Sequence, residues 1–371
     1  MIFFENIFNA GVKVQPIKDA DGMAVKESEG KVQVFPETVA FYKEYVTEQY
    51  KNGSRPGMFK EPAISDELVA KAKDFADVAI VSISRFSGEG WDRGIDETDD
   101  IRTEYTMWPG EKEQRETYRD VFKTNDFYLT DEEKKVIDIA KSNFKKVVVV
   151  LNVGGVIDTN WTFEEGIDAV LMSWQGGMEG GLATADVLCG DVNPSGRLTA
   201  SFPRNVGQIP VFYNHKNCGR PISSHSPYKR YTSSYMDVLN APLYPFGYGL
   251  SYGKVNYGNL CLSADNAAIG TTVTVSVTLE NPSEYDITET IQIYVRDNAA
   301  SITRPVKELK AYKQVLVKAG ETIVVELPLE TSRLGFYCSD LNYVVEPGEF
   351  TIMAGPSSDS ESLLKTKLTL K

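Results

Sequence analysis

A short apolar run that ends in a glycine-rich loop constrains the fold of this chain more than any other feature. The run is Val78-Ala-Ile-Val-Ser-Ile-Ser84, and the loop is Ser87-Gly-Glu-Gly-Trp-Asp-Arg93. Because the run is short, β-branched and bounded by turn residues, it predicts a buried strand. In open α/β sheets, ligands bind beyond the carboxyl ends of the strands. The flanking glycines free the backbone to aim Glu89 outward at such a site.

Two other interpretations of this loop stay open. The spacing Gly88-x-Gly90-x-x-x-Gly94 resembles a dinucleotide fingerprint, which requires a helix to open there. Instead, an acidic stretch follows, Gly94-Ile-Asp-Glu-Thr-Asp-Asp100, and it would repel a pyrophosphate. The simpler alternative is a solvated loop in which Glu89 only pairs with Arg93.

Strand-like and helix-like stretches alternate along the first half of the chain. A capping box, Thr130-Asp-Glu-Glu133, begins a helix. The unbroken apolar run Val147–Asn152 predicts a strand that is covered on both faces. The sequence also predicts helices over 38–50 and 65–75, a strand over 168–174, and a further helix that ends at 189–190. Residues 94–126 lack a steady period and predict an irregular rim or a mobile surface loop. The alternation predicts a doubly wound, mainly parallel α/β sandwich.

The second half of the chain has a different pattern of apolar and polar residues. From Thr271, apolar and polar residues alternate at period two, and short strands are predicted over 291–295, 315–317, 323–327 and 350–353. Turn residues separate them, which is typical of an antiparallel β-sandwich of the fibronectin-III or immunoglobulin type. We therefore expect an α/β sandwich over 1–200, an extended wrapping segment over 201–262, and a β-sandwich over 263–371.

Composition excludes several classes of partner and cofactor. The 371 residues carry a net charge of −13, which disfavours nucleic acid. No apolar run is long enough for a bilayer, and the first residues lack the features of a signal peptide, so we expect a cytoplasmic location. The four cysteines have no metal-ligand spacing, and two histidines are too few for a triad or metal cage. We expect free thiols, no metal and no cofactor.

Taken together, these motifs resemble the C-terminal part of family 3 glycoside hydrolases, enzymes of the β-glucosidase type. The resemblance starts near Phe75 and includes the Glu89 loop. Its other motifs are Gly176-Gly-Met-Glu-Gly-Gly181, Ala185–Leu198, Phe202–Pro210, Leu243–Tyr252, Arg304–Lys310 and Pro347–Phe350. Most of these match fold-carrying positions, and Asn193–Gly196 and Phe246–Gly249 are interpreted as turns and packing.

The resemblance implies a role for Glu89 as the general acid/base of a retaining β-glycosidase. Such enzymes place two carboxyls about 5 Å apart, and the acid needs a raised pKa. We expect the neighbouring Trp91, Asp92 and Arg93 to contact the substrate, a β-glycoside or oligosaccharide. In the family the nucleophile is an Asp on a separate (β/α)8 barrel, a domain of about 250 residues. No stretch of this chain resembles the barrel's nucleophile motif.

The front of the chain departs from the family pattern. The family's sandwich begins with a strand and a glycine-rich loop that have no counterpart before Ile2. We therefore expect a fragment that hydrolyses little or nothing alone. An unpaired sheet edge predicts self-association or completion by a partner. The alternative function is a non-catalytic carbohydrate-binding or protein-interaction module on the same fold. The preferred sugar is left open, because the barrel would largely set it.

Overall fold

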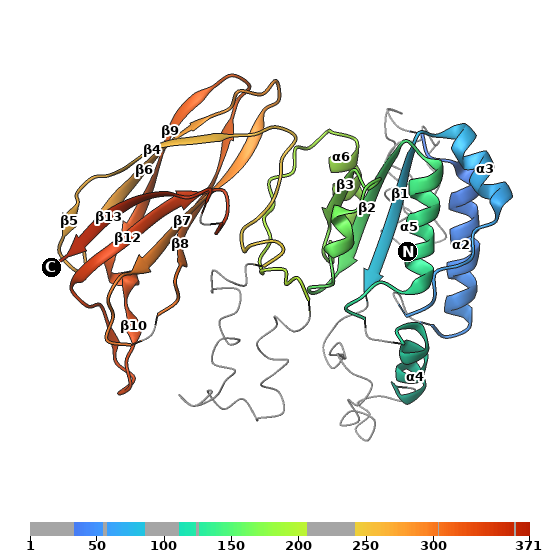
Figure 1. The fold of residues 1–371 in the computed structure, drawn as a ribbon, viewed down its shortest axis with the longest axis horizontal. Coiled ribbons are helices and arrows are strands. Elements are labelled where there is room, and N and C mark those ends of the chain that lie inside the picture. Colours follow the sequence, from blue (N-terminus) through green and yellow to red (C-terminus); the bar gives the residue numbers. More distant parts are fainter. Residues whose placement is uncertain are drawn as a thin grey trace. The chain divides into compact units, whose positions relative to one another are not determined.

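The structure is a computed structural model, and it describes residues 33–54, 58–85, 111–123, 126–205, 242–302, 304–359 and 361–371. The chain divides into two compact units, Met1–Val192 and Asn193–Lys371. Figure 1 shows their helices and strands. The loop with Glu89, Trp91, Asp92 and Arg93 lies outside the described residues. The three-part division at residues 200 and 262 stays a prediction.

The first unit is built on a parallel sheet, as predicted. Strands β1 (Val78–Arg85), β2 (Lys146–Val153) and β3 (Ala169–Met172) pair in the order β1-β2-β3. β1 runs in register with β2 along its whole length, from Val78↔Lys146 to Arg85↔Val153. On one face of β2, Val147, Val149, Leu151 and Val153 join a core with helix α5 (Asp131–Asn143).

The other face of β2 is also covered. There Val150 packs against Ile80, Leu171 and Leu188, the last from helix α6 (Gly180–Leu188). Because helices cover both faces, an unbroken apolar run is stable at the centre of the sheet. This confirms the doubly wound, parallel architecture.

Side-chain caps begin two of the helices at the predicted residues. Helix α2 spans Pro36–Lys51 and α3 spans Asp66–Phe75. The Ser65 hydroxyl accepts the backbone N–H of Leu68 at 3.2 Å, which caps α3. At α5 the capping box is complete, since Thr130 Oγ1 accepts from Glu133 N at 3.1 Å and Glu133 Oε2 accepts from Thr130 N at 2.8 Å. Helix α3 contacts both α2 and α5, and α5 packs against β1 (Figure 1).

The prediction of an irregular stretch over 94–126 was wrong in part. Helix α4 spans Glu111–Val121. Tyr118, Val121 and Phe122 at its end are buried with Met58, and their spacing of three and four residues is that of one helix face. The first turns of α4 contain only polar residues. The helical repeat of apolar residues is therefore too short to be recognised within this acidic stretch of the sequence.

We expect the substitution Thr130→Ala to lower the free energy of unfolding by about 1–2 kcal/mol, because it removes one half of the capping box. The Thr130→Ser variant keeps the hydroxyl and should stay within about 0.5 kcal/mol of the parent. Urea unfolding followed by circular dichroism measures both. Equal stability of the Ala and Ser variants would show that the hydroxyl does not cap this helix.

The second unit is a β-sandwich, as predicted. Its sheets have the strand orders β5-β13-β12-β7-β8 and β4-β6-β9, and β10 and β11 form a small hairpin. All pairs are antiparallel except β5 with β13. The bounds are β4 Asn256–Leu262, β5 Asn266–Ala267, β6 Thr272–Glu280, β7 Ile287–Asp297, β8 Glu308–Val317, β9 Thr322–Glu330, β10 Phe336–Tyr337, β11 Tyr343–Val344, β12 Gly348–Gly355 and β13 Leu364–Leu370. Two short 3-10 helices span Asn160–Phe163 in the first unit and Thr331–Leu334 in the second.

The sandwich core follows the period-two pattern of the sequence. Val273, Val275, Val277 and Leu279 of β6 are buried at alternate positions and pack in one cluster with residues of β7, β9, β12 and β13. The polar residues between them point the other way, as expected for a sheet with one solvated face. Within the described part of the chain, no helix has the length and apolar character needed to cross a bilayer.

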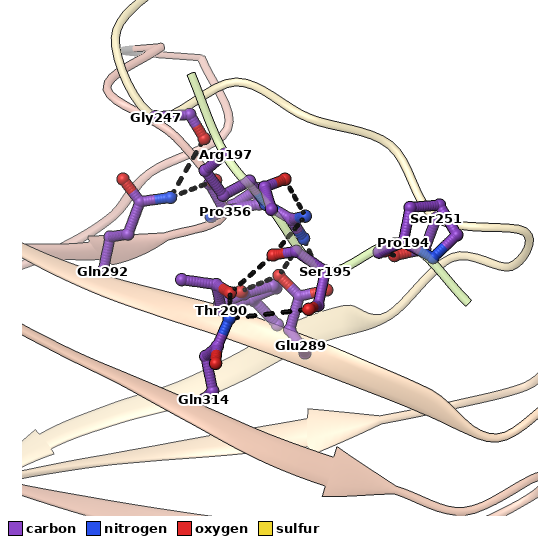
Figure 2. A network of polar contacts seen from close by, with 12 residues as sticks. Pro194, Ser195, Arg197, Gly247, Ser251, Glu289, Thr290, Gln292, Gln314 and Pro356 are labelled. Carbon is purple, nitrogen blue, oxygen red and sulfur yellow. Dashed lines mark hydrogen bonds and ion pairs between the residues drawn. The ribbon is translucent and has the colours of Figure 1, made fainter. Parts of the chain in front are cut away.

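A polar network pins residues 193–197 to strand β7, and Figure 2 shows it from close by. Arg197 Nη2 lies 3.1 Å from both carboxylate oxygens of Glu289, and both side chains are almost fully buried. The Thr290 hydroxyl donates to Ser195 O at 2.9 Å. Gln292 Nε2 donates to the carbonyls of Gly247 and Pro356. Segments distant in sequence are thereby fixed on the sandwich.

Candidate active site

The carboxyl ends of the three parallel strands lie at one edge of the first unit's sheet. Arg85 pairs with Val153, and β3 pairs with β2 up to Leu151↔Met172. The loop with the candidate acid/base begins at Ser87, two positions after the last residue of β1, and Glu89 follows Arg85 by four positions. The strand therefore fixes the point from which the loop departs, at the edge where open α/β sheets bind ligands.

Arg85 is the centre of a saturated polar hub at this edge. Its side chain is fully buried. Nη1 and Nη2 bind the two oxygens of Glu133 at 2.6 and 2.9 Å. The other N–H groups donate to the carbonyls of Asp126 (2.8 Å), Ser84 (2.8 Å) and Tyr128 (3.0 Å). All five donors of the guanidinium thus have partners. A buried charge of this kind is tolerated only with such complete pairing.

The hub joins both ends of the segment that contains the candidate loop. Residue 85 precedes residues 86–125, and Asp126 and Tyr128 follow them. The ring of Phe122 lies over the guanidinium, 4.7 Å from Arg85 Cζ, and the Tyr118 hydroxyl donates to the Asp126 carboxylate. The arginine therefore fastens the end of β1 to α4 and to the start of α5. We name Arg85, Glu133, Asp126, Tyr128 and Phe122 the Arg85 hub.

A second carboxyl stands close to this hub. The Tyr42 hydroxyl of α2 donates to Glu61 Oε1 at 2.5 Å. The pKa of Glu61 is raised to about 7, mainly by burial and also by the negative charge of Glu133, while the hydrogen bond from Tyr42 acts in the opposite direction. Sequence reasoning missed this residue, because nothing around Glu61 marks it as buried.

Glu61 gives the first unit a pH-dependent stability. Its pKa in the folded state lies above its ordinary value of 4.5. The folded state therefore binds more protons than the unfolded state between these values, and stability falls as pH rises through the window from 4.5 to 7. We expect a loss of roughly 2–3 kcal/mol between pH 4.5 and pH 8, and a flatter profile for Glu61→Gln. Urea unfolding at five pH values measures it. Parallel profiles for both proteins would contradict this account.

The turn after β3 lies at the same sheet edge. Trp174 adopts a positive φ of 55°, which is costly for a large side chain and is found most often at functional sites. Gly176 lies so close to Gly180 that an added Cβ would be 2.7 Å from Gly180 Cα. Sequence reasoning singled out the glycines as fold-carrying but missed Trp174, whose backbone conformation has no signal in the sequence.

The described residues contain no group of three or more His, Cys, Asp or Glu side chains able to hold a metal ion. Cys261 and Cys338 form no disulfide within the described part of the chain. At the strand ends the described residues hold the closed Arg85–Glu133 ion pair, which suits the positioning of the chain segments around it.

Comparisons with known proteins agree with the fold. The profile of the glycosyl hydrolase family 3 C-terminal domain matches residues 17–252, and that of the fibronectin type III-like domain matches residues 289–358. The solved structure of β-glucosidase 3B from Thermotoga neapolitana in complex with glycerol superposes with a TM-score of 0.69 at 29% identity. The match covers 90% of this chain and 44% of that one.

Sequence relatives give the same result. Beta-glucosidase A of Butyrivibrio fibrisolvens is 36% identical over 356 residues, which is 90% of this chain and 42% of the relative. The periplasmic beta-glucosidase of Salmonella typhimurium is 41% identical over 62% of this chain and 30% of its own length. A beta-xylosidase of Formosa agariphila is 40% identical over 66% and 33%. The chain thus spans less than half the length of these relatives. It belongs to glycoside hydrolase family 3, as the family's C-terminal domain followed by a fibronectin type III-like domain.

Proposed function

We propose that this chain supplies the general acid/base, Glu89, of a retaining β-glycosidase that removes terminal β-linked sugars. The observation that carries the proposal is the end of β1, which lies at the carboxyl edge of a parallel sheet four residues before Glu89 and is fastened by the buried Arg85 hub. A rigid support of this kind is what a proton donor needs, because proton transfer depends on hydrogen-bond geometry.

The relatives support the choice of substrate class. The three relatives described above are two β-glucosidases and one β-xylosidase, and the chemistry that these three share is the cleavage of a β-glycosidic bond. We propose that Trp91, Asp92 and Arg93, which follow Glu89 directly, contact the sugar. The choice between glucose and xylose then depends on groups outside this loop.

Glu89 acts in both halves of the proposed reaction. As an acid it protonates the leaving oxygen while a nucleophilic carboxylate attacks the anomeric carbon, which gives a covalent glycosyl-enzyme. As a base it then takes a proton from water, which releases the sugar with its configuration retained. We propose that the nucleophile is an Asp on a (β/α)8 barrel domain in the same or another polypeptide.

The test compares Glu89→Ala with the parent, each in the protein that joins this chain to its barrel. We expect kcat/KM to fall by about 10²–10⁴-fold for alkyl and simple aryl β-glycosides, because their leaving groups need protonation. Dinitrophenyl β-glycosides need no acid for departure, so their first step should change little. A control variant, Glu165→Ala, changes an exposed carboxylate and should leave both rates unaltered.

Three results would contradict the proposal. Equal losses for activated and unactivated substrates would show that Glu89 supports the fold or binds the sugar, and does not transfer a proton. Undiminished hydrolysis by Glu89→Ala would favour the non-catalytic module. Full activity of this chain alone would place the nucleophile inside it and remove the need for a barrel.

A further inference from the structure

An exposed aromatic hairpin in the second unit plays no part in the proposed chemistry. Strands β10 and β11 pair Tyr337 directly with Tyr343, so both rings lie on one face of the hairpin. Tyr337 is 68% exposed, Tyr343 46%, and Leu341 at the tip 81%. We name residues 336–344 the tyrosine hairpin. Large apolar side chains gathered in solvent in this way indicate a binding surface.

The base of the tyrosine hairpin is fixed to the sandwich. Phe336 is buried, and the guanidinium carbon of Arg304 lies 4.8 Å from the centre of its ring. Arg304 is buried too and binds Glu308 Oε2 at 2.7 Å. A cation over an aromatic face, itself held by a carboxylate, gives the hairpin a rigid foundation.

The two tyrosine rings are held in place before any ligand arrives. The backbone N–H of Gly335 donates to the Tyr343 hydroxyl at 3.1 Å. Only glycine fits there, because an added Cβ would lie 2.2 Å from Val344 O. The ring centres of Tyr337 and Tyr343 are 5.2 Å apart, at 69° to each other, which is a favourable edge-to-face arrangement. Binding to such rings costs little side-chain entropy.

The tip of the hairpin places polar groups beside the rings. Asp340 accepts from Cys338 Sγ at 2.6 Å and from Asn342 Nδ2 at 2.9 Å. Cys338 N–H donates to Asn342 O at 3.0 Å, and Leu341 adopts a positive φ of 65°. The tip is therefore a defined loop with an exposed carboxylate and amide. It combines apolar rings with hydrogen-bonding groups within seven residues.

The size and charge of this surface decide what binds there. A stable protein interface buries about 800 Å² on each partner, more than three side chains on a short hairpin provide. The acidic chain disfavours nucleic acid. A sugar ring has an apolar C–H face that stacks on an aromatic ring and hydroxyls that donate to carboxylates. We propose that the tyrosine hairpin is a non-catalytic binding site for one or two residues of a β-linked glycan.

The choice of a β-linked glycan rests on the proposed function, but binding and hydrolysis are measured separately. The probes are soluble mixed-linkage β-glucan and arabinoxylan, each cast into a native gel, with the α-linked glucan pullulan as a reference. We expect the purified chain to be retarded by at least one β-linked glycan and not by pullulan. The Tyr337→Ala variant should show an apparent Kd at least about tenfold weaker, because it removes the more exposed ring.

The matched control is Tyr312→Ala, which removes an equally exposed tyrosine, 68%, from β8 of the same unit. It should migrate as the parent does. If Tyr337→Ala unfolds in a thermal melt, Leu341→Ser tests the same surface and should also weaken retardation. Three results would overturn the inference. They are the absence of any retardation, retardation by pullulan alone, and equal retardation of the parent and the folded hairpin variants. Glu89→Ala should still be retarded, so a failed hairpin and a failed catalytic proposal give different results.

Discussion

Replacing Arg85 with methionine is expected to lower the free energy of unfolding of the first unit by about 3–5 kcal/mol. The substitution leaves the Glu133 carboxylate at low exposure without its main partner. It also leaves the carbonyls of Asp126 and Tyr128 without the donors that they have in the native protein. Uncompensated buried acceptors are costly because no water replaces the lost hydrogen bonds. Urea unfolding followed by circular dichroism measures the change.

A double substitution separates the interaction energy of the Arg85–Glu133 pair from the contributions of the surrounding groups. Arg85→Met combined with Glu133→Leu removes both charges, so it should destabilise less than the sum of the two single variants. Lys141→Met is the matched control, because its ion pair with Glu164 at 2.8 Å is partly exposed and should contribute less than about 1 kcal/mol. Strictly additive losses at Arg85 and Glu133 would show that the hub is not a coupled unit.

The second large effect is expected at Gly247 in the sandwich unit. This glycine has a φ of +78°, and an added Cβ would lie 2.0 Å from Gln292 Oε1 and 2.7 Å from the Tyr294 hydroxyl. Gln292 is buried, and its amide holds the carbonyls of Gly247 and Pro356, so it has little room to move. Gly247→Ala combines a left-handed backbone with overpacking and should cost about 3 kcal/mol or more.

Gly320→Ala isolates the backbone part of that cost. Gly320 has a similar φ of +71°, but no atom lies within 4 Å of an added Cβ. We expect it to lose about 1–2 kcal/mol, from backbone strain alone. Thermal unfolding of both variants compares the two effects in the same unit. Equal losses of stability in the two variants would mean that the polar network around Gln292 rearranges to admit the Cβ at no cost in free energy.

The sequence predicted elements best where a local signal sets them. The capping box at Thr130 and the cap at Ser65 identified helix starts to within a residue. The apolar run at Val147 predicted a central strand, because only burial on both faces tolerates such a run. Phe246–Gly249 was interpreted as turn and packing, and the positive φ of Gly247 agrees.

Other elements depend on tertiary contacts and were not predicted. Strand β4 lies in the stretch interpreted as an extended segment, and α4 shows its apolar face only where Tyr118 and Phe122 meet Met58. Strand β13 had a signal, since Leu364-Lys-Thr-Lys-Leu-Thr-Leu370 alternates at period two, but the strands predicted from the sequence ended at residue 353. The Arg85 hub could not be predicted, because its other members lie 37 to 48 residues further along the chain.

The most direct test of the central claim, that Glu89 is the acid/base, uses azide with Glu89→Ala in a protein that joins this chain to the proposed barrel domain. A small anion can enter the space left by the carboxyl and attack the glycosyl-enzyme without a general base. With a dinitrophenyl β-glycoside, azide should therefore accelerate turnover of Glu89→Ala and not of the parent. The product should be a glycosyl azide with the β configuration, because two displacements retain the anomeric centre. Turnover of Glu89→Ala that azide leaves unchanged, with only free sugar formed, would contradict the assignment.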